Sequence, residues 1–396
     1  MLEGKRLIWQ AAGGLAEGTM SEITSSALMG LDRRELSSLV EQTGEPGYRA
    51  QQLLEAVYRK RVESIAQIST LPQQVRKVLA ERGWVIGTPN IEKRFASQDG
   101  TVRYLLGFED GQSVETVWMP EGDGGEAGDG SEAGDTEVEG NSRNWERATI
   151  CVSSQVGCAV DCQFCLTALL GVKRNLTAGE IVGQVCAVLA DQKVSPPQDR
   201  INLVFMGMGE PFLNYDNLMK AVGLLVEEVG VAESRMTVST AGIVPRIHDF
   251  GRELVRPKLA ISLNASNEEQ RTRLMPLNRK WNLEKLMAAA REFPLRNRER
   301  ITFEYVLLNG VNDETSNARE VVELLRGLRS KVNLIALNPG PGIEFSTPAE
   351  SRVRAFQEIL MKAGIPAFVR RPRGRDIFAA CGQLKRTVEI AKAPES

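Results

Sequence analysis

From Ala148 onward, short apolar segments alternate with amphipathic ones, and this alternation restricts the possible folds more than any other feature of the chain. The segments predicted as strands are 149–153, 201–206, 236–239, 259–263, 301–307, 332–337 and 366–370. The segments predicted as helices are 178–191, 215–229, 283–292, 315–328 and 349–363. Such alternation builds βαβ units, so the sequence predicts an α/β fold with a partial (β/α) barrel of the TIM type. In such barrels, function lies at the carboxyl ends of the strands.

The chain of 396 residues is longer than one average domain, and its composition changes along its length. We predict a disordered tail (1–27), a helical accessory module (28–90), a β extension to the barrel (91–120), an acidic Gly-rich flexible insert (121–145) and the core barrel (146–396). Residues 121–140 of the insert hold eight acidic residues and no basic ones, so the chain without them is net positive. This distribution weakly favours a polyanionic partner.

The accessory module has clear helix signals. Asp32 and Glu35 fit a capping box ahead of a helical period, Tyr48–Tyr58 has helical spacing, and Pro72 fits the start of a third helix. The module also carries the basic residues Arg49, Arg59, Lys60 and Arg61. These four side chains could bind phosphates, although a solvated helix face is an equally good interpretation.

Composition excludes several classes of protein. No apolar run is long enough to cross a bilayer, and the N-terminal apolar patch is too short for a signal peptide, so we expect a cytoplasmic protein without membrane contact. His248 is the only histidine, which argues against nearly every His-based mechanism, Ser-His-Asp hydrolysis included.

The cysteines carry the strongest chemical signal. Cys158, Cys162 and Cys165 form a C-x3-C-x2-C run directly after the first predicted barrel strand. Three thiolates can hold three irons of a [4Fe–4S] cluster and leave the fourth iron open, where S-adenosylmethionine (SAM) can bind and be cleaved to a radical. The competing interpretation is a structural zinc site with Cys151 as fourth ligand. The gap from Cys151 to Cys158 does not fit the paired C-x2-C knuckles that are usual for zinc.

Polar residues also end the later strands of the predicted barrel. They are Gly209 and Glu210, Ser239, Ser262 and Asn264, and Asn338. Taken singly, each Ser or Asn is more often a helix cap or a turn residue. Their recurrence at one rim of the barrel predicts a single shared pocket.

With these motifs together, the chain resembles the RlmN family of bacterial 23S rRNA and tRNA adenine-C2 methyltransferases, which are radical SAM enzymes. The resemblance extends from about Leu28 to Thr387, apart from the acidic insert. Its most specific segments are Cys151-Val-Ser-Ser-Gln-Val-Gly-Cys158, the three-cysteine run, Asn175-Leu-Thr-Ala-Gly-Glu180, Met206-Gly-Met-Gly-Glu-Pro211 and Ala379-Ala-Cys-Gly-Gln-Leu384. The resemblance implies a radical SAM barrel and a [4Fe–4S] cluster held by Cys158, Cys162 and Cys165.

The resemblance also implies roles for further residues. Those expected to contact SAM are Gly209, Glu210, Ser239, Ser262, Leu263, Asn264 and Asn338. Cys381 matches the family's cysteine that carries the methyl group. Cys151 matches the cysteine that resolves the protein–RNA adduct, and Glu115 matches the residue that accepts the proton. The sequence departs from the family at Asn264, where histidine is more usual.

The expected activity is formation of 2-methyladenosine in 23S rRNA and tRNA through a methyl-cysteine intermediate and a transient disulfide. The resemblance implies a low-potential electron donor such as flavodoxin with flavodoxin reductase, and we expect a monomer. The helical module and the loop with Arg370, Arg371, Arg373 and Arg375 are expected to contact RNA. Two alternatives remain at this point. One is the paralogous enzyme that methylates C8 of adenine in 23S rRNA and confers antibiotic resistance, and the other is a zinc-stabilised RNA-binding protein without catalysis.

Overall fold

The computed structural model describes residues 27–121, 145–380 and 382–384, and every structural statement below refers to these residues. Within them, one ten-stranded sheet has the order β1-β2-β3-β4-β7-β8-β9-β10-β11-β12. Its strands are β1 (Asn90–Ala96), β2 (Val102–Gly107), β3 (Ser113–Glu121), β4 (Arg147–Cys151), β7 (Ile201–Phe205), β8 (Met236–Thr240), β9 (Lys258–Ser262), β10 (Ile301–Leu307), β11 (Ser330–Ala336) and β12 (Ala367–Val369). All seven barrel strands predicted from the sequence are present, with ends shifted by no more than a few residues.

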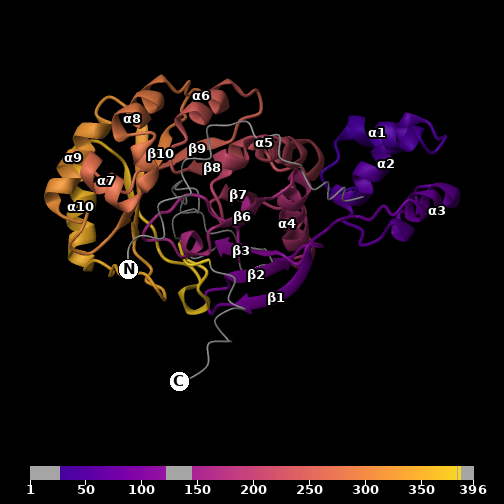
Figure 1. Cartoon of the computed structure of the whole chain (residues 1–396), viewed down its shortest axis with the longest axis horizontal. Coiled ribbons are helices and arrows are strands. Elements are labelled where there is room, and N and C mark those ends of the chain that lie inside the picture. The colour runs from indigo at the N-terminus through magenta and orange to yellow at the C-terminus, as the bar shows by residue number, and fades with distance from the viewer. Residues whose placement is uncertain (1–26, 122–144, 381, 385–396) are drawn as a thin grey trace, which may run out of the picture.

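From β4 to β12 each strand is parallel to its neighbour, as the strand–helix alternation predicts. The helices that follow these strands are α4 (Ala178–Asp191), α5 (Tyr215–Leu224), α6 (Val244–Arg252), α7 (Glu268–Leu274), α8 (Leu283–Glu292), α9 (Thr315–Leu325) and α10 (Glu350–Lys362). They surround the curved sheet, with α6 to α10 forming an outer arc (Figure 1). The sheet order is linear, with β1 and β12 as its two edges, so the fold is a partial (β/α) barrel.

Apolar packing between strands and helices explains the barrel. On β10, Phe303 and Tyr305 are fully buried, and the ring of Tyr305 lies 5.1 Å from that of Phe356 on α10. These odd-numbered residues therefore face the outer helices. Because successive side chains of a strand point to opposite faces, Thr302 and Glu304 face the barrel interior.

Two helices were not predicted from the sequence. Helix α6 holds only two buried apolar side chains, Ile247 and Phe250, and α7 is a short, highly charged segment. Neither segment shows the long apolar stripe on which a helix prediction depends.

The β extension joins the barrel through its edge. Strands β1, β2, β3 and β4 pair antiparallel, so the extension continues the barrel sheet on the side of β4. The turn between β1 and β2 contacts the C-terminal segment: Ser97 Oγ donates to Asp376 at 2.6 Å, and the Gly374 amide donates to Asp99 at 3.0 Å. The extension thereby holds residues close in sequence to position 381.

The N-terminal helices are α1 (Arg33–Glu41), α2 (Ala50–Leu54), which continues into a π-helical turn over Glu55–Arg59, and α3 (Gln73–Glu81). The predicted capping box is present, with Asp32 accepting from the Glu35 amide at 2.9 Å and Glu35 accepting from the Asp32 amide at 2.8 Å. The three helices lie to one side of the barrel, beyond α4 and α5 (Figure 1). An ion pair of 2.7 Å between Glu35 and Lys220 links α1 to α5.

Among the described residues, no helix combines the length and apolar character needed to span a membrane. Residues 1–26 of the predicted tail, residues 122–144 of the predicted insert and Cys381 lie outside the described part of the chain.

Candidate active site

The three-cysteine run lies in the loop of a small hairpin that the sequence did not predict, formed by β5 (Gln155–Gly157) and β6 (Val172–Asn175). The loop leaves β5 at Gly157, whose φ is +81° and where a Cβ would lie 1.8 Å from the Gly171 carbonyl oxygen. Only glycine fits there. The Cys165 amide donates to the Cys162 carbonyl at 3.1 Å, which folds the run into a turn. The structure thus brings the three cysteines together beside the carboxyl end of β4.

The surroundings of Cys158 and Cys162 disfavour thiolates in the absence of a cation. Burial raises the pKa of Cys158 to about 12 against the opposing hydrogen bond from the Val160 amide, and the nearby Cys165 and Glu210 add to the increase. The pKa of Cys162 is also raised by burial and by the other two thiols, whereas Arg271 acts in the opposite direction. Metal ions stabilise coordinating thiolates, and three soft sulfur donors in one partly buried loop suit an iron–sulfur cluster. Within the described residues, no three His, Cys, Asp or Glu side chains are arranged to hold a single ion.

The glycine loop that follows β7 packs against the start of this hairpin. Gly209 has φ +103°, and a Cβ there would lie 2.7 Å from atoms of Gln155. The Gln155 side chain accepts from the Glu210 amide at 2.9 Å and donates to Asn175 at 2.8 Å. Gln155 therefore fixes the glycine loop, Gly209 and Glu210 included, to both strands of the cysteine hairpin.

Glu210 is buried between the ends of β7 and β8. Its two carboxylate oxygens accept from the Ala241 amide at 2.7 Å and from the Phe212 amide at 3.1 Å. Burial raises the pKa of Glu210 to about 7 against the opposing effect of these hydrogen bonds. The carboxyl group is thus held rigidly beside the cysteine loop.

The other predicted strand-end residues lie along the same rim. Ser239 and Ser262 approach each other, with their Oγ atoms 3.5 Å apart. Asn338 is buried, and its Oδ1 has no hydrogen-bond partner among the described residues. An unpartnered buried acceptor is costly unless a ligand satisfies it, so Asn338 fits a ligand contact.

Leu263 and Asn264, also predicted to contact SAM, make hydrogen bonds to other residues of the protein. Both amides donate to the Glu304 carbonyl, at 2.9 and 3.3 Å. Asn264 adopts φ +57°, its Oδ1 accepts from the Val306 amide at 2.9 Å, and its Nδ2 donates to the sulfur of Met275 at 3.4 Å. Asn264 therefore fixes the turn after β9, and its contact with SAM stays a prediction.

A cavity of about 390 Å³ opens beside this rim. Cys151, Cys165 and Asn338 line it, as do Ala380 and Gly382, the neighbours of Cys381. The end of β4 and the cysteine loop thus meet, at one cavity, the neighbours of position 381, which are more than 200 residues further along the chain.

Glu115 does not line this cavity. It is buried on β3 in an ion pair with Arg103 of β2, whose guanidinium lies 4.2 Å from the centre of the Phe95 ring. The Glu115 carbonyl accepts from Ser153 Oγ at 2.6 Å, and the same hydroxyl accepts from the Met208 amide at 2.9 Å. Glu115 is thus tied to the glycine loop, while its predicted role as proton acceptor stays a prediction.

Two polar residues of the cavity wall, Glu304 and Asn333, were not predicted from the sequence. Both lie within apolar strands and are almost fully buried. The sequence did contain a signal for Glu304, because it is a charged residue inside an otherwise apolar strand. A buried carboxylate is rare without a partner or a function.

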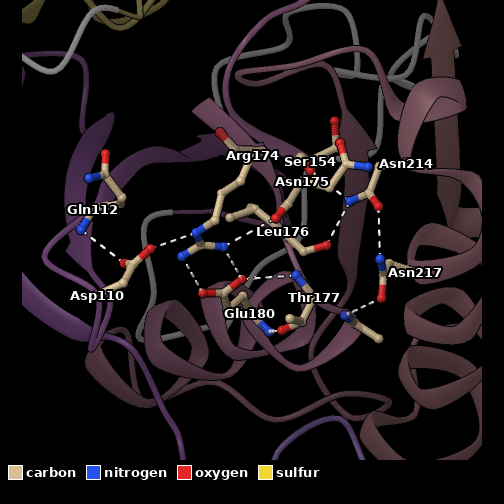
Figure 2. A network of polar contacts seen from close by, with 12 residues as sticks. Asp110, Gln112, Ser154, Arg174, Asn175, Leu176, Thr177, Glu180, Asn214 and Asn217 are labelled. Carbon is tan, nitrogen blue, oxygen red and sulfur yellow. Dashed lines mark hydrogen bonds and ion pairs between the residues drawn. The ribbon is translucent and has the colours of Figure 1, made fainter. Parts of the chain in front are cut away.

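A polar network anchors the cysteine hairpin to its surroundings (Figure 2). Arg174 of β6 donates to Glu180 at the start of α4 with two bonds of 2.7 Å, and to Asp110 of the β2–β3 turn at 2.6 Å. Asn214, which precedes α5, donates to the carbonyls of Ser154 and Leu176 at 2.8 and 2.7 Å. The hairpin is therefore held by the β extension and by the starts of the barrel helices α4 and α5.

Comparison with known proteins gives two family models. Residues 152–333 match the Radical SAM superfamily, and residues 26–85 match the ribosomal RNA large subunit methyltransferase N-terminal domain. A crystal structure of a radical SAM methyltransferase from Sphaerobacter thermophilus aligns with a TM-score of 0.80 at 42% identity, covering 91% of this chain and 99% of that one.

Two curated relatives are similar over almost their whole length. The probable dual-specificity RNA methyltransferase RlmN of Koribacter versatilis is 69% identical over 88% of this chain and 98% of the relative. The dual-specificity RNA methyltransferase RlmN of Syntrophobacter fumaroxidans is 46% identical over 88% of this chain and 95% of the relative. Membership of this family implies an iron–sulfur cluster and SAM, and it sets aside the interpretation as a zinc-stabilised protein without catalysis. The chain belongs to the RlmN family of radical SAM RNA methyltransferases.

Proposed function

We propose that this enzyme forms 2-methyladenosine in 23S rRNA and tRNA. The main support for this proposal is that Cys151, Cys165 and the two neighbours of Cys381 line one cavity at the carboxyl ends of the barrel strands. A methyl transfer through Cys381 with resolution by Cys151 requires a resolving thiol, the cluster loop and the methyl-carrying segment at one place.

Cys158, Cys162 and Cys165 would hold a [4Fe–4S] cluster, because they supply three thiols from one partly buried loop. When bound, the cluster supplies the electron that splits SAM into methionine and a deoxyadenosyl radical. Gly209, Glu210, Ser239, Ser262, Leu263, Asn264 and Asn338 are proposed to hold SAM. The rigid attachment of the glycine loop to the hairpin by Gln155 supports this, since it fixes one binding element relative to the other.

The remaining steps use this chain's own side chains. Adenine C2 is an electron-poor carbon that does not attack the methyl group of SAM directly, so the methyl group passes first to the Cys381 thiol. After radical carbon–carbon bond formation, Glu115 accepts the C2 proton and the adduct gives up its unpaired electron. Cys151 then attacks the sulfur of Cys381, the S–C bond to the RNA breaks, the released carbon takes up a proton to complete the methyl group, and a disulfide remains. The buried position of Cys151 at the end of β4 shields that thiol from solvent until the adduct forms.

The RNA substrate must present an unstacked adenine, because a base inside a helix is inaccessible to a barrel cavity. Arg370, Arg371 and Arg373 line the cavity and provide cations for the flanking phosphates. We further propose that residues 28–90 form an RNA-contacting module, that the enzyme is a cytoplasmic monomer without membrane contact, and that flavodoxin with flavodoxin reductase supplies the electrons.

The test is mass spectrometry of 23S rRNA and tRNA from cells with and without the gene. We expect 2-methyladenosine to be lost from both RNAs in the deletion strain and restored by the wild-type gene. Restoration should fail with Cys381→Ala. Unchanged 2-methyladenosine, or the appearance of 8-methyladenosine as the gene-dependent product, would refute the proposed product and favour the C8 paralogue.

A further inference from the structure

A row of polar side chains crosses the interior of the barrel. Ser262 of β9 is in register with Glu304 of β10, and Glu304 with Asn333 of β11. Residues in register on parallel strands point to the same face, so the three side chains lie side by side. Ser239 of β8 extends the row through its 3.5 Å approach to Ser262. The interior of such a barrel is usually filled by bulky apolar residues, so a polar row requires an explanation.

The row has more hydrogen-bond acceptors than donors. Asn333 Nδ2 donates to Glu304 Oε1 at 2.8 Å, and this is the one side-chain hydrogen bond that Glu304 makes within the described residues. Because the Asn333 amide group directs its nitrogen at the carboxylate, its Oδ1 points elsewhere, and that atom is buried without a partner there. Glu304 is 6% exposed and Asn333 is 2% exposed, and both line the cavity.

Such an arrangement is costly in the folded protein unless a ligand completes it. Leaving a buried acceptor unsatisfied costs about 1–3 kcal/mol, and more for a charged group. Burial raises the pKa of Glu304, whereas the positive charge of Arg370 and the hydrogen bond from Asn333 act in the opposite direction. No ion pair compensates the carboxylate within the described residues, so this position selects for a ligand with N–H or O–H groups.

We propose that Glu304 and Asn333 form a recognition site for the amino and hydroxyl donors of an adenosine, with Glu304 Oε2 and Asn333 Oδ1 as acceptors. This deepens the proposed function and rests on it, because the reaction brings two adenosines to the cavity, that of SAM and that of the target nucleotide. Both offer an exocyclic amino group and ribose hydroxyls. The position next to Ser262 and the lining of the cavity fit either one, and binding measurements separate them.

The informative variant is Glu304→Gln, which preserves shape. In this variant Asn333 Nδ2 still donates to the side-chain oxygen of the glutamine. The new amide nitrogen therefore faces the ligand, where its N–H groups repel the N–H and O–H donors of the adenosine. Affinity for the bound adenosine should fall by about 10- to 100-fold, as expected for an unpaired polar contact in a site built to hydrogen-bond its ligand. The matched control is Glu228→Gln, since Glu228 is also a buried carboxylate but does not line the cavity.

Two binding measurements on cluster-loaded protein decide which adenosine is recognised. Calorimetry with S-adenosylhomocysteine should show the loss if the site holds the adenosine of SAM. The second measurement compares a hairpin RNA that contains the target adenosine with the same RNA carrying purine riboside, which lacks the amino group, at the target position. If the site holds the target base, Glu304→Gln should weaken binding of the adenosine-containing RNA. In that case the wild type discriminates the two RNAs about tenfold, as a lost polar contact predicts, and Glu304→Gln does not discriminate.

The controls make the outcome decisive. Asn333→Ala removes the second acceptor, together with the amide that donates to Glu304, and serves as an independent variant if Glu304→Gln does not fold. Unchanged affinity of the folded variants for both S-adenosylhomocysteine and the hairpin RNA overturns the proposal. Failure of the proposed function is seen separately, as absence of 2-methyladenosine in the RNA product of the wild-type enzyme.

Discussion

Arg271 shows how one residue can connect the strand ends of the barrel. Its guanidinium is fully buried on α7 and donates to the carbonyls of Ala241, Ser262 and Leu263 and to the side chain of Asn278, at 2.7 to 3.3 Å. Burial lowers its pKa to about 10, with Cys162 and Glu268 opposing. The planar fork of arginine, and not merely its charge, satisfies this set of acceptors.

Arg271→Lys should therefore destabilise the protein although it keeps the charge. The ammonium group of lysine is a single charged atom and cannot reach the acceptors at the ends of β8 and β9 and in the turn after α7 together. We therefore expect a loss of about 2–4 kcal/mol in the free energy of unfolding. Urea unfolding measures this value. The matched control is Arg273→Lys on the exposed side of the same helix, and equal stability of the two variants would contradict the prediction.

Among individual residues, those that belong to a recognisable sequence motif could be predicted, and those outside such motifs could not. The cysteine run and Met206–Pro211 are recognisable because spacing and glycine content carry the signal. Arg271 is surrounded by charged residues in sequence and looks like part of a solvated face. Its burial depends on the packing of α7 beneath the cysteine loop, where the Gln163 amide donates to the Leu274 carbonyl at 3.0 Å.

At the scale of elements, the cysteine hairpin is the piece that needs external support, because strands of three and four residues are marginal on their own. Arg174 supplies much of that support through Asp110 and Glu180 (Figure 2). The pKa of Asp110 lies below its usual 3.8, because hydrogen bonds from Arg174 and the Gln112 amide outweigh the raising effect of burial.

A carboxylate whose pKa is depressed by folding stabilises the protein above its unfolded pKa, and this contribution is lost as the pH falls through the folded pKa. Asp110→Asn should thus lower stability at neutral pH by about 1 kcal/mol, a value discounted for partial exposure. The difference from wild type should shrink below pH 3.8. Urea unfolding across pH checks this, with Arg174→Met as background. If the Asp110→Asn effect is equally large in that background, the assigned partner is wrong.

Elements with a strong local signal were predicted well, and weak ones were not. The capping box at Asp32 and the buried apolar strands β7 and β10 follow from sequence pattern alone. The β5–β6 hairpin has neither the length nor the alternation that marks a strand. Its existence depends on Gln155, Asn175 and the glycine loop meeting in three dimensions.

At the scale of the whole molecule, the β extension at one edge of the sheet contacts the C-terminal segment that follows β12 at the other edge. Asp99 accepts from the Gly374 amide, and Gly374 has φ +57° with Thr101 and Ala379 packed around it. Nothing in the local sequence of either segment predicts a contact across 275 positions. It places the residues before Cys381 at the cavity, as the proposed methyl carrier requires.

Asp99→Ala should separate the two halves of the reaction. Loosening the segment before Cys381 should slow RNA methylation about 10-fold, because small displacements of reacting groups are costly. Formation of 5′-deoxyadenosine in the absence of RNA depends on the cysteine loop and should stay near the wild-type rate. The control is Asp216→Ala, an exposed position on α5. A parallel loss of both activities would mean that the contact supports the fold and not the carrier segment.

The most direct test of the proposed chemistry is the iron, sulfide and 5′-deoxyadenosine content of anaerobically purified protein after reduction with SAM. We predict about four irons and four sulfides per chain for the wild type, with 5′-deoxyadenosine formed, and loss of all three in Cys162→Ala. Zinc without labile sulfide, and no 5′-deoxyadenosine from the wild type, would contradict the assignment of Cys158, Cys162 and Cys165 as cluster ligands.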